Sequence, residues 1–376
     1  MNLALSDEQE FLREAARGAL SRFKTVEAAR EALEQGKGAL PDLWSVAREA
    51  GWPGLLVSEE HGGAGLEAFD AMLVMSECGR VLAGVPLLGH LPATAILQAS
   101  SGAPHLAELA SGELRAAYLP TCPPGDLELD WTVDREHGSG RAAAPVAENV
   151  DGGIAVSGRL AFVPDAPGAD VLVGVALVGG EPTGFAVESG TQGVTVQEVD
   201  GYDATRLLGH VVLDGAVAQK LDAPIEALAD AWHLAQALIA AESIGSVETA
   251  LDVTVAYAKE RHTFGRAIGS YQAVKHSLTE VLRQLENGRS LLYYAGWSRD
   301  GAPGEFALSA NAARSVGGRA LDTAARTMIS VHGGIGATWE HDAPLYFRRA
   351  QLSRRLVGGT GLASDRVAGE LISQAA

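Results

Sequence analysis

Two short stretches in the C-terminal third of the sequence could hold a phosphate-bearing ligand with a flat ring. In the first stretch, the planar guanidinium of Arg261 can pair with phosphate oxygens, and Phe264 offers an apolar ring face. In the second stretch, the backbone N–H groups of Gly333 and Gly334 are free to meet an anion. Each pattern also has a structural interpretation, because an exposed Glu-Arg pair is often a surface ion pair and glycines after a helix often form a turn.

Glu242 is a third residue that could do chemistry, as a proton acceptor. It follows Ala240 and Ala241 in an Ala-rich stretch with helical spacing, where a carboxyl group on the buried face is unusual. Burial raises the pKa of a carboxyl group toward neutrality, which suits a general base. The alternative is a structural glutamate that pairs with a basic residue of another helix.

The hydrophobic periodicity changes twice along the chain and divides it into three regions. Residues 1–113 show helical spacing, beginning with a capping box from Ser6 to Gln9. Residues 114–221 hold short β-branched runs separated by Gly, Pro and Asp, which favours a small antiparallel barrel or sandwich. Residues 222–376 return to long helical stretches with short connections, which is typical of an antiparallel four-helix-type bundle. We therefore expect an α+β multi-domain fold with these three regions as domains.

Composition and charge limit the classes of partner. The 376 residues are 47% hydrophobic with a mean hydropathy of +0.08, and no uninterrupted apolar run reaches membrane-spanning length, so we expect no membrane association. The first residues lack the basic start and apolar centre of a signal peptide, which makes the cytoplasm the expected location. A net charge of −18 disfavours nucleic acid. The two cysteines and the lack of zinc-type Cys/His spacing predict a reduced compartment and no metal site.

Motifs spread over nearly the whole chain resemble those of the acyl-CoA dehydrogenase family, whose members oxidise CoA thioesters with FAD. In family order they lie at residues 42–55, 59–66, 260–266, 271–276, 332–341 and 359–360. Among them, the segment Glu260-Arg261-His262-Thr263-Phe264-Gly265-Arg266 is followed by Tyr271 and Gln272. The motifs are specific together, whereas each alone is a weak signal. The resemblance implies a helix–strand–helix order, FAD as cofactor and an acyl-CoA substrate. It also implies an electron-transfer flavoprotein as the usual electron acceptor.

The resemblance further implies which residues contact FAD. In the family, the Arg-containing segment and the Gly-rich loop serve the FAD of a neighbouring subunit, so a complete site requires an oligomer. The positions that match the neighbour-facing set are Arg261, Phe264, Gln272, His332, Gly333 and Gly334, and Tyr271 is a further position expected to bind the cofactor. Other positions that match FAD-contacting motifs are Phe162, which can stack on a flavin, Ser330, where the family has an adenine-side glutamine, and Thr360 of the Gly-Thr motif.

The catalytic glutamate of the family is missing from both of its usual positions. Most members keep it directly before the Gly-Thr motif, where this chain has Gly358. A second family location, counted back from Arg261, falls near Ala235. Glu242 lies about two helical turns after Ala235, on the same side of the predicted helix, and so remains a candidate for a displaced base.

Contacts to the chain's own flavin also depart from the family. Residues 119–124 replace a Thr-Glu-Pro loop, and Pro164 replaces a residue whose hydroxyl lies near flavin N5. This pattern resembles the non-catalytic partner subunit of actinobacterial α2β2 acyl-CoA dehydrogenases, many of which act on CoA esters of steroid side chains. We therefore expect a subunit that completes the FAD site of a homologous catalytic subunit. Two alternatives are a self-sufficient homotetramer that uses Glu242, and a flavin-free binding or scaffold protein on the same fold.

Overall fold

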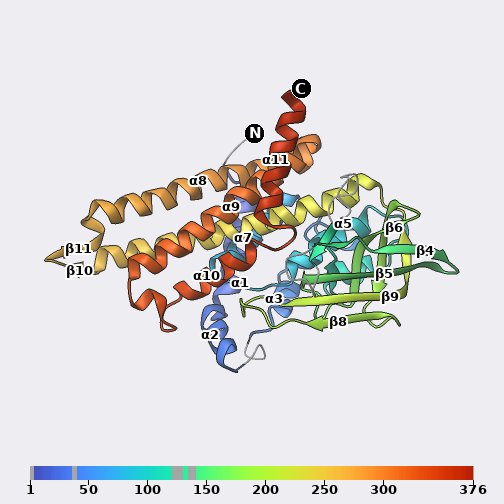
Figure 1. Cartoon of the computed structure of the whole chain (residues 1–376), viewed down its shortest axis with the longest axis horizontal. Helices are drawn as coiled ribbons and strands as arrows, with labels where there is room; N and C mark the ends of the chain where they lie inside the picture. The colour runs from blue at the N-terminus through green and yellow to red at the C-terminus, as the bar shows by residue number, and fades with distance from the viewer. Residues whose placement is uncertain (1–3, 36–39, 121–129, 134–140, 376) are drawn as a thin grey trace.

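The N-terminal part of the protein is helical, as its periodicity predicts. The computed structural model describes residues 4–35, 40–120, 130–133 and 141–375 (Figure 1). Helix α1 begins at the predicted capping box, where Ser6 Oγ accepts from the Gln9 N–H and Gln9 Oε1 accepts from the Ser6 N–H. The helices are α1 (Asp7–Ser21), α2 (Thr25–Gln35), α3 (Leu43–Glu49), α4 (Ala68–Arg80), α5 (Leu87–Gln98) and α6 (Leu106–Ser111), with short 3-10 helices η2 (Trp52–Gly54) and η3 (Glu59–His61).

The central strands form a barrel. They are β1 (Ala116–Tyr118), β4 (Val146–Val150), β5 (Gly153–Pro164), β6 (Val171–Val178), β7 (Glu181–Glu188), β8 (Val194–Glu198) and β9 (Leu208–Leu221), beside a separate pair of β2 (Asp130–Val133) and β3 (Arg141–Ala143). In the main sheet β6, β4, β5, β9 and β7 are neighbours in that order, and β7 pairs again with β6, so the sheet closes on itself. The predicted strand region is confirmed, with one correction. Both β1 and β4 pair with β6 in parallel, which the long stretch of chain between these strands makes possible.

The C-terminal part is the predicted helical bundle. Its helices are α7 (Ile225–Glu260), α8 (Gln272–Gly301), α9 (Pro303–His332), α10 (Ala343–Ser353) and α11 (Gly359–Ala375), with 3-10 helices η4 (Ile268–Ser270) and η5 (Ile335–Ala337). A small hairpin of β10 (His262–Thr263) and β11 (Arg266–Ala267) joins α7 to α8. This hairpin lies at the end of the bundle remote from the barrel (Figure 1). No helix within the described ranges is long and apolar enough to cross a membrane.

Helices α4 and α7 pack backbone against backbone through two glycines. A Cβ atom at Gly79 would lie 1.9 Å from the carbonyl oxygen of Glu242, and a Cβ atom at Gly245 would lie 1.9 Å from that of Ser76. Neither position has room for a side chain, so glycine sets the distance between the helices. This contact holds the middle of α7, including Glu242, in the centre of the molecule.

Two buried histidines make the stability of this fold sensitive to acid. Burial lowers the pKa of His90 to about 4 and the pKa of His233 to about 3. In the unfolded chain a histidine titrates near pH 6.5, so below that pH the unfolded chain binds more protons than the folded one. The stabilisation from keeping these rings neutral is therefore fully present above about pH 6.5, and it is lost as the pH falls toward the folded values.

We expect the free energy of unfolding to fall by about 2 kcal/mol per buried histidine between pH 7 and pH 5. Urea denaturation of the full chain at several pH values measures this slope. His233→Asn should make the slope shallower, whereas His276→Asn, at an exposed position on α8, should leave it unchanged. An unchanged slope in His233→Asn would contradict the assignment.

Candidate functional site

A cavity of about 970 Å³ lies between the barrel and the bundle. Its walls come from β5, from the segment before β9, from α7 and from the turn between α10 and α11. Phe162 and Gly358 both line it, and so does Trp232. The cavity therefore brings together the predicted flavin-stacking aromatic and the position where most of the family keeps its base, which are 196 residues apart in sequence.

Phe162 points into the cavity because β5 is irregular at this point. The register with β9 shifts between Leu160 and Val163, and Phe162 has a φ of 56°. A bulky side chain rarely adopts this conformation, and a bulge of this kind re-aims a side chain. The Phe162 N–H donates to His210 Nδ1 at 3.4 Å, and the two rings meet edge to face at 4.9 Å. His210 thus contacts both the backbone and the ring of Phe162.

The turn at Gly358 is held from inside the bundle. Val357, Gly358 and Gly359 all have positive φ, at 50°, 80° and 79°. Gln236 Nε2 donates to the Val357 carbonyl at 2.7 Å, and buried Arg314 donates to the Leu356 carbonyl at 3.2 Å. Burial lowers the pKa of Arg314 to about 10.

Proton acceptors are scarce around this turn. Gly358 brings no carboxyl group to the cavity, and Asp200 is the only acid among the described residues that line it. Ala235 is fully buried in α7 and has no side chain that could accept a proton. Pro120 also lines the cavity, but residues 121–124 of the predicted Pro-rich loop lie outside the described residues.

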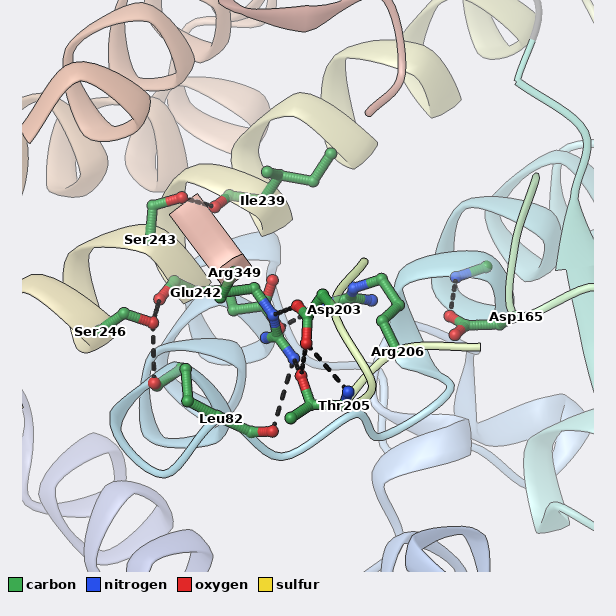
Figure 2. Close-up of polar contacts among 12 residues, drawn as sticks. Leu82, Asp165, Asp203, Thr205, Arg206, Ile239, Glu242, Ser243, Ser246 and Arg349 are labelled. Carbon is green, nitrogen blue, oxygen red and sulfur yellow. Dashed lines mark hydrogen bonds and ion pairs between the residues drawn. The ribbon is translucent and has the colours of Figure 1, made fainter. Parts of the chain in front are cut away.

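Glu242 lies outside the lining of the cavity, within a buried cluster of charged side chains (Figure 2). Arg349 Nη1, from α10, donates to Glu242 Oε1 at 2.6 Å, and Arg206 Nη2 donates to the same oxygen. Arg349 Nε donates to Asp203 Oδ2 at 2.6 Å, while its Nη2 donates to Thr205 Oγ1 and to the Leu82 carbonyl. The side chains of Glu242, Arg206 and Arg349 are each at most 1% exposed.

The arginines dominate the electrostatics of this cluster. Burial alone would lower the pKa of Arg349 and raise the pKa of Asp203. Their mutual attraction, with Glu242 and Thr205, reverses both shifts: the pKa of Arg349 is raised and that of Asp203 is lowered. Glu242 Oε1 accepts from two guanidinium groups, and the whole carboxylate is buried outside the lining of the cavity, where it does not meet a ligand bound there. This geometry favours the structural interpretation of Glu242 over the catalytic one.

Sequence reasoning missed the arginine partners of Glu242. Arg349 follows Leu345 and Tyr346 by four and three residues, so helical spacing places it on their buried face. A charged residue on the buried face of a helix indicates a buried ion pair, and this pattern could have identified Arg349 from the sequence. No signal identified Arg206 or Asp203, which lie in an irregular segment before β9.

The residues expected to contact a neighbour's FAD gather at the other end of the bundle. Arg261 directly follows α7, and Phe264 lies at the tip of the β10–β11 hairpin, where it is 95% exposed. Tyr271 Oη donates to the Thr263 carbonyl at 3.2 Å, and Gln272 begins α8 directly afterwards. The structure therefore brings these four sequence-predicted residues to one place.

The Gly-rich loop lies at the same end. The ring of His332, at the end of α9, stacks on the ring of Tyr257, with 4.3 Å between the centroids. Tyr257 lies four residues before Arg261 on α7. The Nδ1 atom of His332 hydrogen-bonds the Met328 carbonyl oxygen at 2.7 Å. Gly333 turns the chain with a φ of 65°, and Gly334 precedes η5.

Ser330 and Thr360 complete the predicted set. Ser330 is exposed near the end of α9, beside the Gly-rich loop. Thr360 lies apart from that loop, at the start of α11, where its N–H donates to the Arg354 carbonyl at 3.1 Å. Its neighbours Gly359 and Gly361 line the cavity.

Glu242→Gln should destabilise the fold rather than only slow a reaction. The substitution leaves Arg206 and Arg349 buried with one negative charge fewer, and breaking a buried pair typically costs about 3–5 kcal/mol. Urea denaturation of the full chain measures the loss. Glu248→Gln is the matched control, because Glu248 pairs with Arg80 at 2.6 Å at a partly exposed site where such pairs contribute less than about 1 kcal/mol. A Glu242→Gln chain as stable as the parent would contradict the structural role.

Comparison with known proteins agrees with this architecture. Residues 6–126 match the acyl-CoA dehydrogenase N-terminal domain, and residues 227–371 match the acyl-CoA dehydrogenase C-terminal domain. The acyl-CoA dehydrogenase IpdE2 of Mycolicibacterium smegmatis is 32% identical over 94% of this chain and 96% of that protein. The acyl-CoA dehydrogenase FadE34 of Mycobacterium tuberculosis is 31% identical over 96% of this chain but only 47% of its own length.

Solved structures of acyl-CoA dehydrogenases have the same fold as this chain. A variant of the Tcur3481-Tcur3483 steroid ACAD superposes with a TM-score of 0.85 at 26% identity, covering 98% of both chains. The ChsE4-ChsE5 complex from Mycobacterium tuberculosis shares the fold, with a TM-score of 0.84 at 23% identity over 99% of both chains. With domain matches on both sides of the barrel and a relative of 32% identity along nearly the whole length, the chain belongs to the acyl-CoA dehydrogenase family.

Proposed function

We propose that this chain is the partner subunit of a heteromeric, FAD-dependent acyl-CoA dehydrogenase. It completes the FAD site of a homologous catalytic subunit and does not supply the catalytic base. The proposal rests on a difference between the two ends of the helical bundle: one end lacks a base, and the other keeps the residues expected to bind a neighbour's FAD. At the cavity the base position is Gly358, whereas the neighbour-facing set around Arg261 is retained.

The far end of the bundle fits a phosphate-bearing cofactor that comes from outside the chain. Arg261 is exposed and has no acidic partner among the residues that the structure describes, so its guanidinium is available to phosphate oxygens. Phe264, at 95% exposure and with a φ of 51°, presents an apolar ring to solvent at the tip of a hairpin. Removing this ring from water is favourable only when a second molecular surface covers it.

In this arrangement, bound FAD supplies the hydride acceptor and the chain supplies binding groups. Arg261 neutralises part of the pyrophosphate charge, and the backbone N–H groups of Gly333 and Gly334 are available to an anion in the same region. The α-proton of the thioester is removed by the other subunit. The buried Arg206 and Arg349 that hold Glu242 speak against a homotetramer in which Glu242 is the base.

The substrate that we propose is a CoA ester with a bulky, steroid-like acyl group. Support comes from the Tcur3481-Tcur3483 structure, which is described as a steroid ACAD and superposes along nearly the whole chain. We further propose a cytoplasmic α2β2 assembly that passes its electrons to an electron-transfer flavoprotein. A flavin-free scaffold, the alternative from another class, would lack a flavin absorbance band in the assembled state.

Arg261→Ala, made in the complex with the glutamate-bearing homologue, should release FAD. Loss of a charge-assisted bidentate contact weakens binding by about ten- to a hundredfold. Flavin absorbance after gel filtration, followed by titration with FAD, measures the change. The control is Arg283→Ala, on the exposed surface of α8, where the guanidinium pairs with Glu280. Equal flavin retention in the two variants would overturn the assignment of Arg261.

A further inference from the structure

The space beside Gly358 is already filled by a tryptophan from another helix. A Cβ atom added at Gly358 would lie 2.9 Å from Trp232 Cη2 and 3.1 Å from Trp232 Cζ2. It would also lie 2.7 Å from Leu362 Cδ2. Contacts this short force a neighbour to move, before any atom of a longer side chain is added.

Of these two neighbours, Trp232 is the one that yields less readily. The terminal methyl of Leu362 belongs to a flexible, half-buried side chain. Trp232 is a rigid ring system on α7, 2% exposed, with the Arg366 guanidinium 5.9 Å from the indole ring. The indole moves only as one rigid unit, so relieving a contact at its edge displaces the whole ring system.

We infer that Trp232 is the residue that keeps this cavity in a non-catalytic form, because its indole occupies the room that any side chain at position 358 needs. The inference rests on the proposed non-catalytic role and gives it a physical cause. Positions 232 and 358 are coupled, so a single substitution at Gly358 cannot return a carboxylate to the cavity. The same indole lines the cavity together with the rings of Phe162 and Tyr202, which suits a flat apolar group that is bound without proton transfer.

A double-mutant cycle on the full chain tests this coupling. The free energy of unfolding is measured by urea denaturation for the parent, Gly358→Ala, Trp232→Leu and the double variant. Gly358 has a φ of +80°, so alanine is strained there in every background, and this effect cancels in the cycle. The interaction energy that remains in the cycle then reports the clash between the methyl group added at position 358 and Trp232, which Trp232→Leu should relieve. In the parent, Gly358→Ala should raise the equilibrium constant for unfolding. In the Trp232→Leu background, the factor by which the same substitution raises that constant should be at least about fivefold smaller.

Gly359→Ala provides the matched control. It also has a positive φ, of +79°, but its Cβ would meet the Arg354 carbonyl oxygen at 2.7 Å rather than Trp232. Its effect should be the same with and without Trp232→Leu. If Trp232→Leu alone is too unstable, Trp232→Phe gives the same comparison with a smaller ring.

Two outcomes overturn the inference: additive effects of Trp232→Leu and Gly358→Ala, or equal relief for Gly359→Ala. Neither outcome touches the assignment of Arg261, since the cycle measures only stability. Conversely, a failure of the FAD assignment would leave the coupling between Trp232 and Gly358 intact.

Discussion

The buried interaction of Arg349 with Glu242 and Asp203 joins the three parts of the molecule. Arg349 comes from α10, Glu242 from α7 and Asp203 from the segment that enters the barrel strand β9. Arg349 also donates to the Leu82 carbonyl, between α4 and α5 of the N-terminal part. Because each of these charges is buried, removing one would leave its partners without compensation. The interaction therefore fixes how the helices and the barrel meet.

The position of the cavity follows from this constraint. Its walls come from β5 and the segment before β9 on one side and from α7, α10 and the following turn on the other. The charged cluster ties α7 and α10 to the segment before β9, and so links the two sides. The cluster also decides the role of Glu242, because an oxygen held by two guanidinium groups serves architecture rather than proton transfer. Because the family resemblance places the base at position 358, where this chain has glycine, we propose that the chain does not supply the base.

Local sequence patterns predict many of the helices, but they do not predict which residues far apart in the sequence come into contact. Helical periodicity predicts α7, α8 and α9, and the Ser6–Gln9 capping box marks the start of α1. The meeting of Phe162 and Gly358 in one cavity could be predicted only through the family resemblance, which carries three-dimensional information. The contact of Trp232 with position 358 depends on how α7 packs against the turn after α10 and leaves no periodic signal. The parallel pairing of β1 and β4 with β6 was missed for the same reason.

We propose that this chain lends a flavin site to a neighbour and keeps none of its own. Counting FAD per chain tests it most directly, with the chain purified alone and together with a glutamate-bearing homologue. We expect little FAD on the isolated chain, and in the complex about half of the one FAD per chain that a homotetramer of this family would hold. A tetramer of this chain alone, with one FAD per chain and acyl-CoA-dependent reduction of an electron acceptor, would contradict it.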